Sequence, residues 1–147
     1  MNHVMYKGCV RATINGCYDG IHPGHLFFFG YVKGKVDRLI VGINSDDYIR
    51  RTKNREPHYL LEQRIDILHN TGLFNEILPF DDDTPNEFIR YINPNYHYTG
   101  EEYAPNPVEK MICDEMGIGL RFVPRIPNLS SSKLDKKFLR KFNKLFL

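Results

Sequence analysis

The sequence predicts an α/β fold: a Rossmann-like three-layer α/β/α sandwich around a five-stranded, mostly parallel sheet. Two observations support this prediction. Segments with strand and helix patterns alternate about five times, as expected when helices cover both faces of a parallel sheet. The run Arg38–Asn44, RLIVGIN, is apolar almost throughout, which is typical of a buried parallel strand. At 147 residues the chain is most simply one domain, residues 1–147.

Each element rests on a local pattern. The predicted strands cover residues 9–14, 38–44, 76–79, 96–99 and 120–124. The predicted helices cover residues 26–32, 60–68, 84–92, 107–116 and 130–146, and a further helix start is expected at residues 44–47. Gly72 closes one helix and Pro94 ends another. Thr84-Pro85-Asn86-Glu87 matches a capping box with proline at the first helical position.

Composition narrows the class of protein. The chain is 41% hydrophobic and 26% charged, as is ordinary for a globular protein. No segment has the apolar length of a membrane span, and the first residues lack a signal peptide's apolar core. Three scattered cysteines fit free thiols in a reducing compartment, so we expect a cytoplasmic protein without a transmembrane segment.

Charge is distributed unevenly. Residues 133–147 carry six Lys or Arg against one Asp, about +5, whereas the whole chain has a net charge of +2. This segment is predicted to be a basic amphipathic helix, which could lie on an anionic membrane. We favour packing on its own domain or on a second subunit, hence a homodimer. The remaining residues, 1–132, are mildly acidic, which weighs against nucleic acid as a partner.

The stretch from Asn15 to His25, NGCYDGIHPGH, is the most informative part of the chain. It lies between a predicted strand and a predicted helix, where free backbone N–H groups and glycines favour a bound phosphate. His22 and His25 add side-chain donors suited to charge developing on phosphorus. A zinc half-site is disfavoured because no Cys or His partner has zinc-like spacing. A purely structural histidine is the other alternative.

The same stretch resembles the signature of the nucleotidylyltransferase superfamily. The matching residues are Gly16-Cys17-Tyr18-Asp19, followed by the His-x-Gly-His motif His22-Pro23-Gly24-His25. Two branches of the superfamily are most similar. Residues 38–46 and 80–85 resemble heptose 1-phosphate adenylyltransferases. Pro124-Arg125 and Ser130-Ser131-Ser132 are more similar to glycerol-3-phosphate cytidylyltransferases, so ATP and CTP both stay open.

The resemblance implies a reaction and its residues. A phosphorylated acceptor would attack the α-phosphorus of a nucleoside triphosphate, and pyrophosphate would leave. The implied catalytic residues are His22, His25, Lys53, Arg55 and Arg125. The implied nucleotide-binding residues are Gly16, Cys17, Tyr18, Asp19, Gly24, Arg64, Gly100, Ser130, Ser131 and Ser132. A magnesium ion is expected on the triphosphate, with Asp19 as the nearest candidate ligand; orientation of the turn is the alternative role for Asp19.

Several of these residues have simpler interpretations. Lys53 and Arg55 could belong to a solvated loop, and Arg125 could form a surface ion pair. The three serines could cap the last helix, and hydroxyls at that position would also suit the triphosphate. Helix register alone leaves Arg64 exposed. Cys17 could have a pKa lowered by the helix N-terminus, although we favour a packing role.

One segment departs from the heptose branch. Thr99-Gly100-Glu101-Glu102-Tyr103 stands where that branch usually has Lys-Gly-Gly-Asp-Tyr. The loss of the lysine points away from heptose phosphate itself as the acceptor. A nucleotide-binding regulator without turnover is the alternative from another class, and the intact histidines argue against it.

Overall fold

The computed structural model describes residues 8–125. Its five strands are β1 (Arg11–Gly16), β2 (Arg38–Asn44), β3 (Glu76–Phe80), β4 (Tyr96–Gly100) and β5 (Gly119–Val123). Its helices are α1 (Pro23–Lys33), α2 (Asp46–Lys53), α3 (Leu61–Asn70), α4 (Asn86–Ile92) and α5 (Lys110–Met116), with a short 3-10 turn, η2 (Glu101–Tyr103). The predicted helices at residues 130–146 and 133–147 lie outside the described residues.

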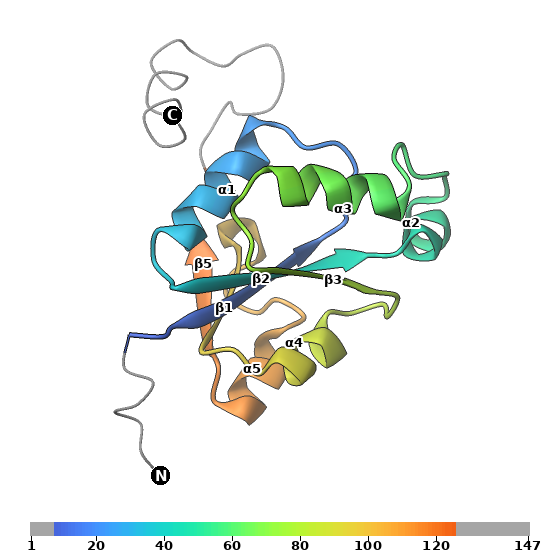
Figure 1. Cartoon of the computed structure of the whole chain (residues 1–147). Helices are drawn as coiled ribbons and strands as arrows, with labels where there is room; N and C mark the ends of the chain where they lie inside the picture. Colours follow the sequence, from blue (N-terminus) through green and yellow to red (C-terminus); the bar gives the residue numbers. More distant parts are fainter. Residues whose placement is uncertain (1–7, 126–147) are drawn as a thin grey trace.

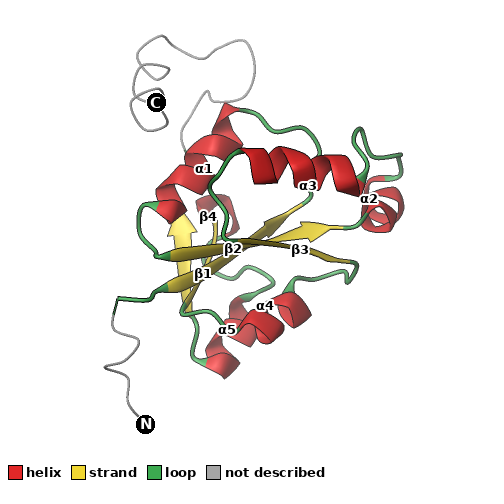
Figure 2. Cartoon of the chain, in the orientation of Figure 1, coloured by secondary structure: helices red, strands yellow, loops and turns green. Residues whose placement is uncertain are grey.

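The strands form one sheet in the order β3-β2-β1-β4-β5, and every neighbouring pair is parallel. Figure 1 shows α1 and α3 on one face of this sheet and α4 and α5 on the other. Coloured by secondary structure, the same view shows the three layers that the sequence predicts (Figure 2). The Rossmann-like α/β prediction is therefore confirmed, and the sheet is wholly parallel.

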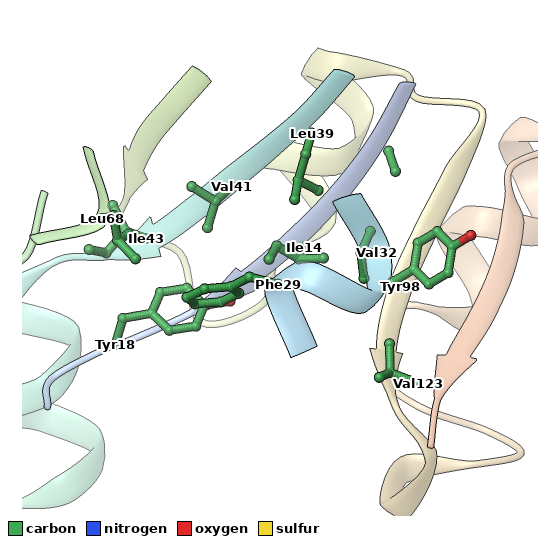
Figure 3. Packing of buried hydrophobic residues seen from close by; sticks show 11 residues of the cluster. Ile14, Tyr18, Phe29, Val32, Leu39, Val41, Ile43, Leu68, Tyr98 and Val123 are labelled. Atoms are coloured by element: carbon green, nitrogen blue, oxygen red, sulfur yellow. The ribbon is translucent and has the colours of Figure 1, made fainter. Parts of the chain in front are cut away.

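Two apolar clusters hold these layers together. The larger joins α1 and α3 to the sheet and includes Tyr18, Phe29 and Leu68, as Figure 3 shows. The smaller lies on the opposite face, where Phe88 and Ile89 of α4 and Ile112 of α5 pack together. Strand β2 is buried from Leu39 to Asn44, as its apolar sequence predicts. No helix within residues 8–125 is long and apolar enough to cross a membrane.

Some predicted boundaries were wrong. Strand β1 lies two residues further along than predicted, and α1 begins at Pro23 rather than at residue 26. The predicted capping box at Thr84 does not form: α4 begins at Asn86, and no side chain caps it. Instead the Thr84 hydroxyl accepts the Asn86 N–H in a local turn (3.4 Å). Helix α5 begins at Lys110 rather than at residue 107.

Candidate active site

A pocket of about 1600 Å³ lies over the carboxyl ends of the strands. Strand β1 pairs with β2 on one side and with β4 on the other, so the chain winds outward from this point in two directions. Ligands of open parallel sheets bind at such a switch point. Most of the predicted site residues line the pocket, namely Gly16, Cys17, Tyr18, Asp19, His22, Gly24, His25, Lys53, Arg55, Gly100 and Arg125. Ser130, Ser131 and Ser132 lie outside the described residues.

His22 and His25 occupy the first turn of α1. The Gly24 N–H donates to His22 Nδ1 (3.0 Å), and the His22 N–H donates to His25 Nδ1 (3.1 Å). This reciprocal pattern is a capping box made of two imidazoles, with ring centroids 4.0 Å apart. Because each Nδ1 accepts a backbone proton, each neutral ring carries its own proton on Nε2. Both rings therefore keep an Nε2–H available for a ligand.

His25 is neutral near pH 7. Burial, together with the neighbouring His22, lowers its pKa to about 4. A neutral imidazole still donates one hydrogen bond through Nε2, so its donor role needs no positive charge. The structural alternative for these histidines and their role as ligand donors are compatible, because capping uses Nδ1 and leaves Nε2 free of it.

Tyr18 fixes the turn that precedes the histidines. Tyr18 has a positive φ of 50° and is 8% exposed. Its ring packs edge-on against the rings of His25 and Phe29. Burial raises the pKa of Tyr18 far above its ordinary value. A Cβ on Gly16 would lie 2.8 Å from Tyr18 Cζ, so only glycine fits beneath this ring. The Tyr18 ring thus fills the space inside the turn, next to Gly16.

Asp19 holds the segment that follows α2. Its carboxylate accepts the N–H groups of His58 (2.8 Å) and Tyr59 (2.9 Å) and the Arg55 guanidinium (2.9 Å). The Asp19 side chain is 3% exposed. Burial alone would raise its pKa, but these three donors outweigh burial and hold the pKa of Asp19 below its ordinary value. Asp19 therefore places Arg55 at the pocket wall.

The basic stretch 50–55 divides into two groups. Arg50 pairs with Asp47 and Glu56, and Arg51 pairs with Asp81 and Asp83. Both guanidinium groups are therefore engaged in ion pairs within the protein. Lys53 and Arg55 line the pocket instead. Lys53 is exposed and forms no ion pair with any residue from 8 to 125. The structure thus places Lys53 and Arg55 at the pocket wall, while their catalytic role stays a prediction.

Arg64 is placed differently from the expectation of an exposed side chain. Its guanidinium is fully buried and donates to three carbonyls, those of Tyr59, Cys17 and Asn44, and to the Asp46 carboxylate; the four distances are 2.7–3.0 Å. Arg64 is not part of the pocket lining. It joins the β1–α1 turn to the end of β2 and the start of α2, which is a positioning role.

Cys17 is half-buried, and burial raises the pKa of its thiol. This result contradicts the possibility of a thiol with a lowered pKa and agrees with the preferred packing role. All three cysteines, Cys9, Cys17 and Cys113, are free. Across the sheet edge, the Arg125 N–H donates to Glu101 (2.8 Å), and its exposed side chain borders the pocket.

The described residues do not fit a magnesium site built from protein ligands. Both oxygens of Asp19 already accept hydrogen bonds from three donors, so its carboxylate is occupied in orienting the turn. Between residues 8 and 125, no group of three or more His, Cys, Asp or Glu side chains is arranged to hold a metal. Asp81 and Asp83, which the sequence places before a helix, are engaged with Arg51.

Several residues that line the pocket were not predicted from the sequence, and Glu109 is the buried charged residue among them. Glu109 lies directly before α5, is 7% exposed and lines the pocket. Nothing in the pattern of residues 107–116 distinguishes it from an ordinary charged residue at the edge of a helix. Its burial arises from tertiary packing around the start of α5, which a single sequence does not display.

Comparison with known proteins places this geometry in a family. The model of the family described as cytidylyltransferase-like matches residues 13–135, and the chain belongs to this family. The membership indicates that the chain is a nucleotidyltransferase.

Particular relatives agree with this family. The chain is 37% identical over 103 residues to the bifunctional protein HldE of Haemophilus influenzae (strain PittEE), covering 69% of the chain and 22% of that protein. It is 32% identical over 129 residues to HldE of Coxiella burnetii (strain Dugway 5J108-111), covering 85% and 27%. The chain thus spans about a quarter of the length of these relatives.

A solved structure shows the same fold. The lipopolysaccharide core biosynthesis protein from Thermoplasma volcanium GSS1 superposes with a TM-score of 0.66 at 18% identity, covering 86% of this chain and 98% of that chain. At this identity the likeness concerns the fold alone.

Proposed function

We propose that the protein transfers a nucleoside monophosphate from ATP or CTP to a small phosphorylated acceptor, such as a sugar phosphate, and releases pyrophosphate. The observation that carries this proposal is the pair of imidazoles at the start of α1, each with Nδ1 occupied by the backbone and Nε2–H available at the pocket. Family membership and the HldE relatives support the same reaction class.

The proposed step is a direct in-line displacement. An oxygen of the acceptor phosphate forms a new bond to the α-phosphorus. The bond from that phosphorus to the bridging oxygen breaks, and pyrophosphate leaves with the electron pair. No covalent enzyme intermediate is needed. Because both reactants are anions, the protein contributes alignment and electrostatic stabilisation.

The named side chains divide this work. His22 and His25 donate from Nε2 to phosphate oxygens whose charge rises in the transition state. Lys53 and Arg55 offset the charge of the phosphates from the opposite side, and Asp19 holds Arg55 in place for this role. Arg125 is proposed to bind phosphate oxygens at the β5 side. Magnesium is a proposed cofactor that would be held by the substrate phosphates rather than by a protein cluster.

A panel assay tests this proposal. Protein with magnesium and each of ATP, CTP, GTP and UTP is mixed with sugar 1-phosphates, glycerol 3-phosphate or phospho-alcohols, and pyrophosphate is followed. Loss of a transition-state donor typically lowers the rate about 10²–10³-fold, and we expect this for His22→Ala and His25→Ala. His69→Ala, an exposed histidine outside the pocket, is the matched control.

The outcomes separate the alternatives. Release with glycerol 3-phosphate and CTP would favour a glycerol-3-phosphate cytidylyltransferase, the second candidate suggested by Pro124-Arg125. Tight nucleotide binding without release from any acceptor would favour a non-catalytic regulator. We also propose that the protein works in the cytoplasm as a homodimer; a monomeric mass by light scattering would contradict the dimer.

A further inference from the structure

One carboxyl group at the pocket has a buried oxygen without a partner in the described part of the chain. Glu109 Oε2 is buried and has no hydrogen-bond partner among residues 8–125. Two other buried side-chain atoms share this property, Asn86 Oδ1 and His97 Nε2. Neither of those residues lines the pocket, whereas Glu109 does. Among the residues that line the pocket, Glu109 is thus the one with a buried side-chain oxygen that has no partner within residues 8–125.

The other carboxylates at the pocket wall are already satisfied or lie in water. Asp19 accepts three hydrogen bonds, and Asp83 pairs with Arg51. Glu101 accepts the Arg125 N–H, and Glu102 is exposed. These carboxylates need no ligand to offset their desolvation.

Glu109 has only partial compensation in the described structure: a hydrogen bond from its own backbone N–H lowers the pKa of its carboxyl group, but burial has the larger effect. No Lys or Arg between residues 8 and 125 pairs with it, because the adjacent Lys110 reaches Asp114 instead (2.9 Å). Its side chain forms no cap hydrogen bond with α5. Burial raises the pKa of this carboxyl group. Since an unpaired buried charge destabilises a fold, a carboxylate kept in this position fits a role in binding.

The chemistry of the pocket narrows the donor that Glu109 would accept. Imidazole, lysine and arginine groups at the α1 and α2 side suit phosphates, which offer acceptors and no cationic donor. The hydroxyl groups of a nucleoside or sugar phosphate are donors, and a carboxylate accepts from hydroxyls through either oxygen. Carboxylates perform this task for ribose in other parallel-sheet nucleotide sites.

We propose that Glu109 is a specificity residue that accepts a hydrogen bond from a substrate hydroxyl. The inference rests on the proposed function for the identity of the substrates. The hydroxyl has two possible sources, the ribose of the nucleotide and the sugar or polyol of the acceptor. Binding measurements distinguish these sources without requiring turnover.

The test compares Glu109→Gln with the wild type and with Glu115→Gln, an exposed glutamate on the adjoining helix α5 and outside the pocket. The first measurement is the melting temperature of the ligand-free proteins. Because the substitution removes an unpaired buried charge at nearly constant volume, we expect Glu109→Gln to melt no lower than the wild type. A clearly lower melting temperature with unchanged ligand binding would assign Glu109 a structural role and overturn the proposal.

The second measurement is calorimetric titration with ATP and CTP and with their 2′-deoxy and 3′-deoxy forms. If ribose is the donor, Glu109→Gln weakens nucleotide binding about tenfold or more, and the matching deoxynucleotide abolishes that difference. A loss that persists with both deoxynucleotides would mean that no ribose hydroxyl is the donor, and would overturn the proposal.

The third measurement uses sugar 1-phosphates and glycerol 3-phosphate as ligands. If the acceptor is the donor, nucleotide affinity is unchanged and the affinity for one of these compounds falls about tenfold or more. Binding of every nucleotide and every phosphate ester that matches the wild type would overturn the proposal. These titrations do not depend on pyrophosphate release, so failure of the proposed reaction is detected separately by the His22 and His25 variants.

Discussion

Arg64→Lys is predicted to destabilise the fold strongly. The guanidinium makes four hydrogen bonds from three nitrogens to the acceptors of Tyr59, Cys17, Asn44 and Asp46. A lysine carries all its donors on one nitrogen and cannot reach acceptors on every side of a planar fork. At least two buried acceptors would lose their partner.

The magnitude follows from these lost bonds. An unsatisfied buried acceptor costs about 1–3 kcal/mol, and breaking one side of a buried ion pair costs about 3–5 kcal/mol. Because the lysine retains its charge and part of the bonding, we expect a loss of about 3 kcal/mol in the free energy of unfolding. For a chain of this length, that loss lowers the melting temperature by roughly 10 °C.

Thermal and urea unfolding, with nucleotide binding measured alongside, test this prediction. Arg90→Lys is the control, since Arg90 pairs with Glu87 on the surface and its side chain is 51% exposed. We expect that control to change the free energy of unfolding by less than about 0.5 kcal/mol. If the melting temperature of Arg64→Lys equals that of the Arg90→Lys control while its nucleotide affinity falls, the positioning role is refuted and a direct nucleotide contact is favoured.

Three further predictions concern the β1–α1 turn and the first turn of α1. Gly16→Ala puts a methyl group 2.8 Å from the buried Tyr18 ring and should destabilise the protein by about 1–3 kcal/mol, whereas Gly34→Ala, whose new Cβ lies 3.4 Å from its nearest neighbour, should not. Asp19→Asn should destabilise the protein by about 3 kcal/mol at pH 7 in urea unfolding, because an amide cannot accept three hydrogen bonds. His25 should not titrate between pH 5.5 and 8 when its ring proton is followed by NMR, because its pKa is lowered to about 4.

The signs of the two pH effects follow from linkage. The folded pKa of Asp19 is lowered, so its stabilisation is present above the ordinary value of about 4 and is lost as the pH falls through the folded pKa. The difference between wild type and Asp19→Asn should therefore shrink in acid. The pKa of His25 is about 6.5 in the unfolded chain and about 4 in the folded protein. Between these two pH values the unfolded chain binds a proton at His25 and the folded protein does not. His25 thus makes folding less favourable as the pH falls through that window. A His25 ring that titrates near pH 6.5 would contradict the burial argument.

The order of strands and helices was readable because burial on both faces leaves a strong apolar signal. The ends of the elements were not, because local patterns compete with tertiary contacts. Thr84 begins a sequence that matches a capping box, yet α4 starts only at Asn86. At α1 the cap is His22 itself, a residue outside the usual Ser, Thr, Asp and Asn set, so the helix was predicted to begin too late.

The placement of His22 and His25 together at the pocket was also predictable, since the two residues are close in sequence and their spacing fits one turn of a helix; their catalytic role stays a prediction. Only the fold shows which basic residues of the stretch 50–55 line the pocket and which form ion pairs elsewhere. Arg51 is held by Asp81 and Asp83, which are about thirty residues away, and this pairing removes it from the pocket. The sequence suggested Lys53 and Arg55 only through resemblance. In the structure Lys53 and Arg55 line the pocket, and Arg55 is held there by its ion pair with Asp19.

Arg64 and Glu109 show what a sequence hides about buried charge. Both residues are charged and buried, and both stand near the ends of helices. Most hydrogen bonds of the Arg64 guanidinium are to backbone carbonyls. Every residue has a backbone carbonyl, so no sequence motif indicates such bonds. Glu109 keeps an oxygen without a partner in the described structure, at the wall of a pocket. Since desolvation destabilises an unpaired charge, the first arrangement stabilises the fold, whereas the second is favourable only with a ligand bound. A lower melting temperature for Arg64→Lys and no decrease for Glu109→Gln would show this difference directly.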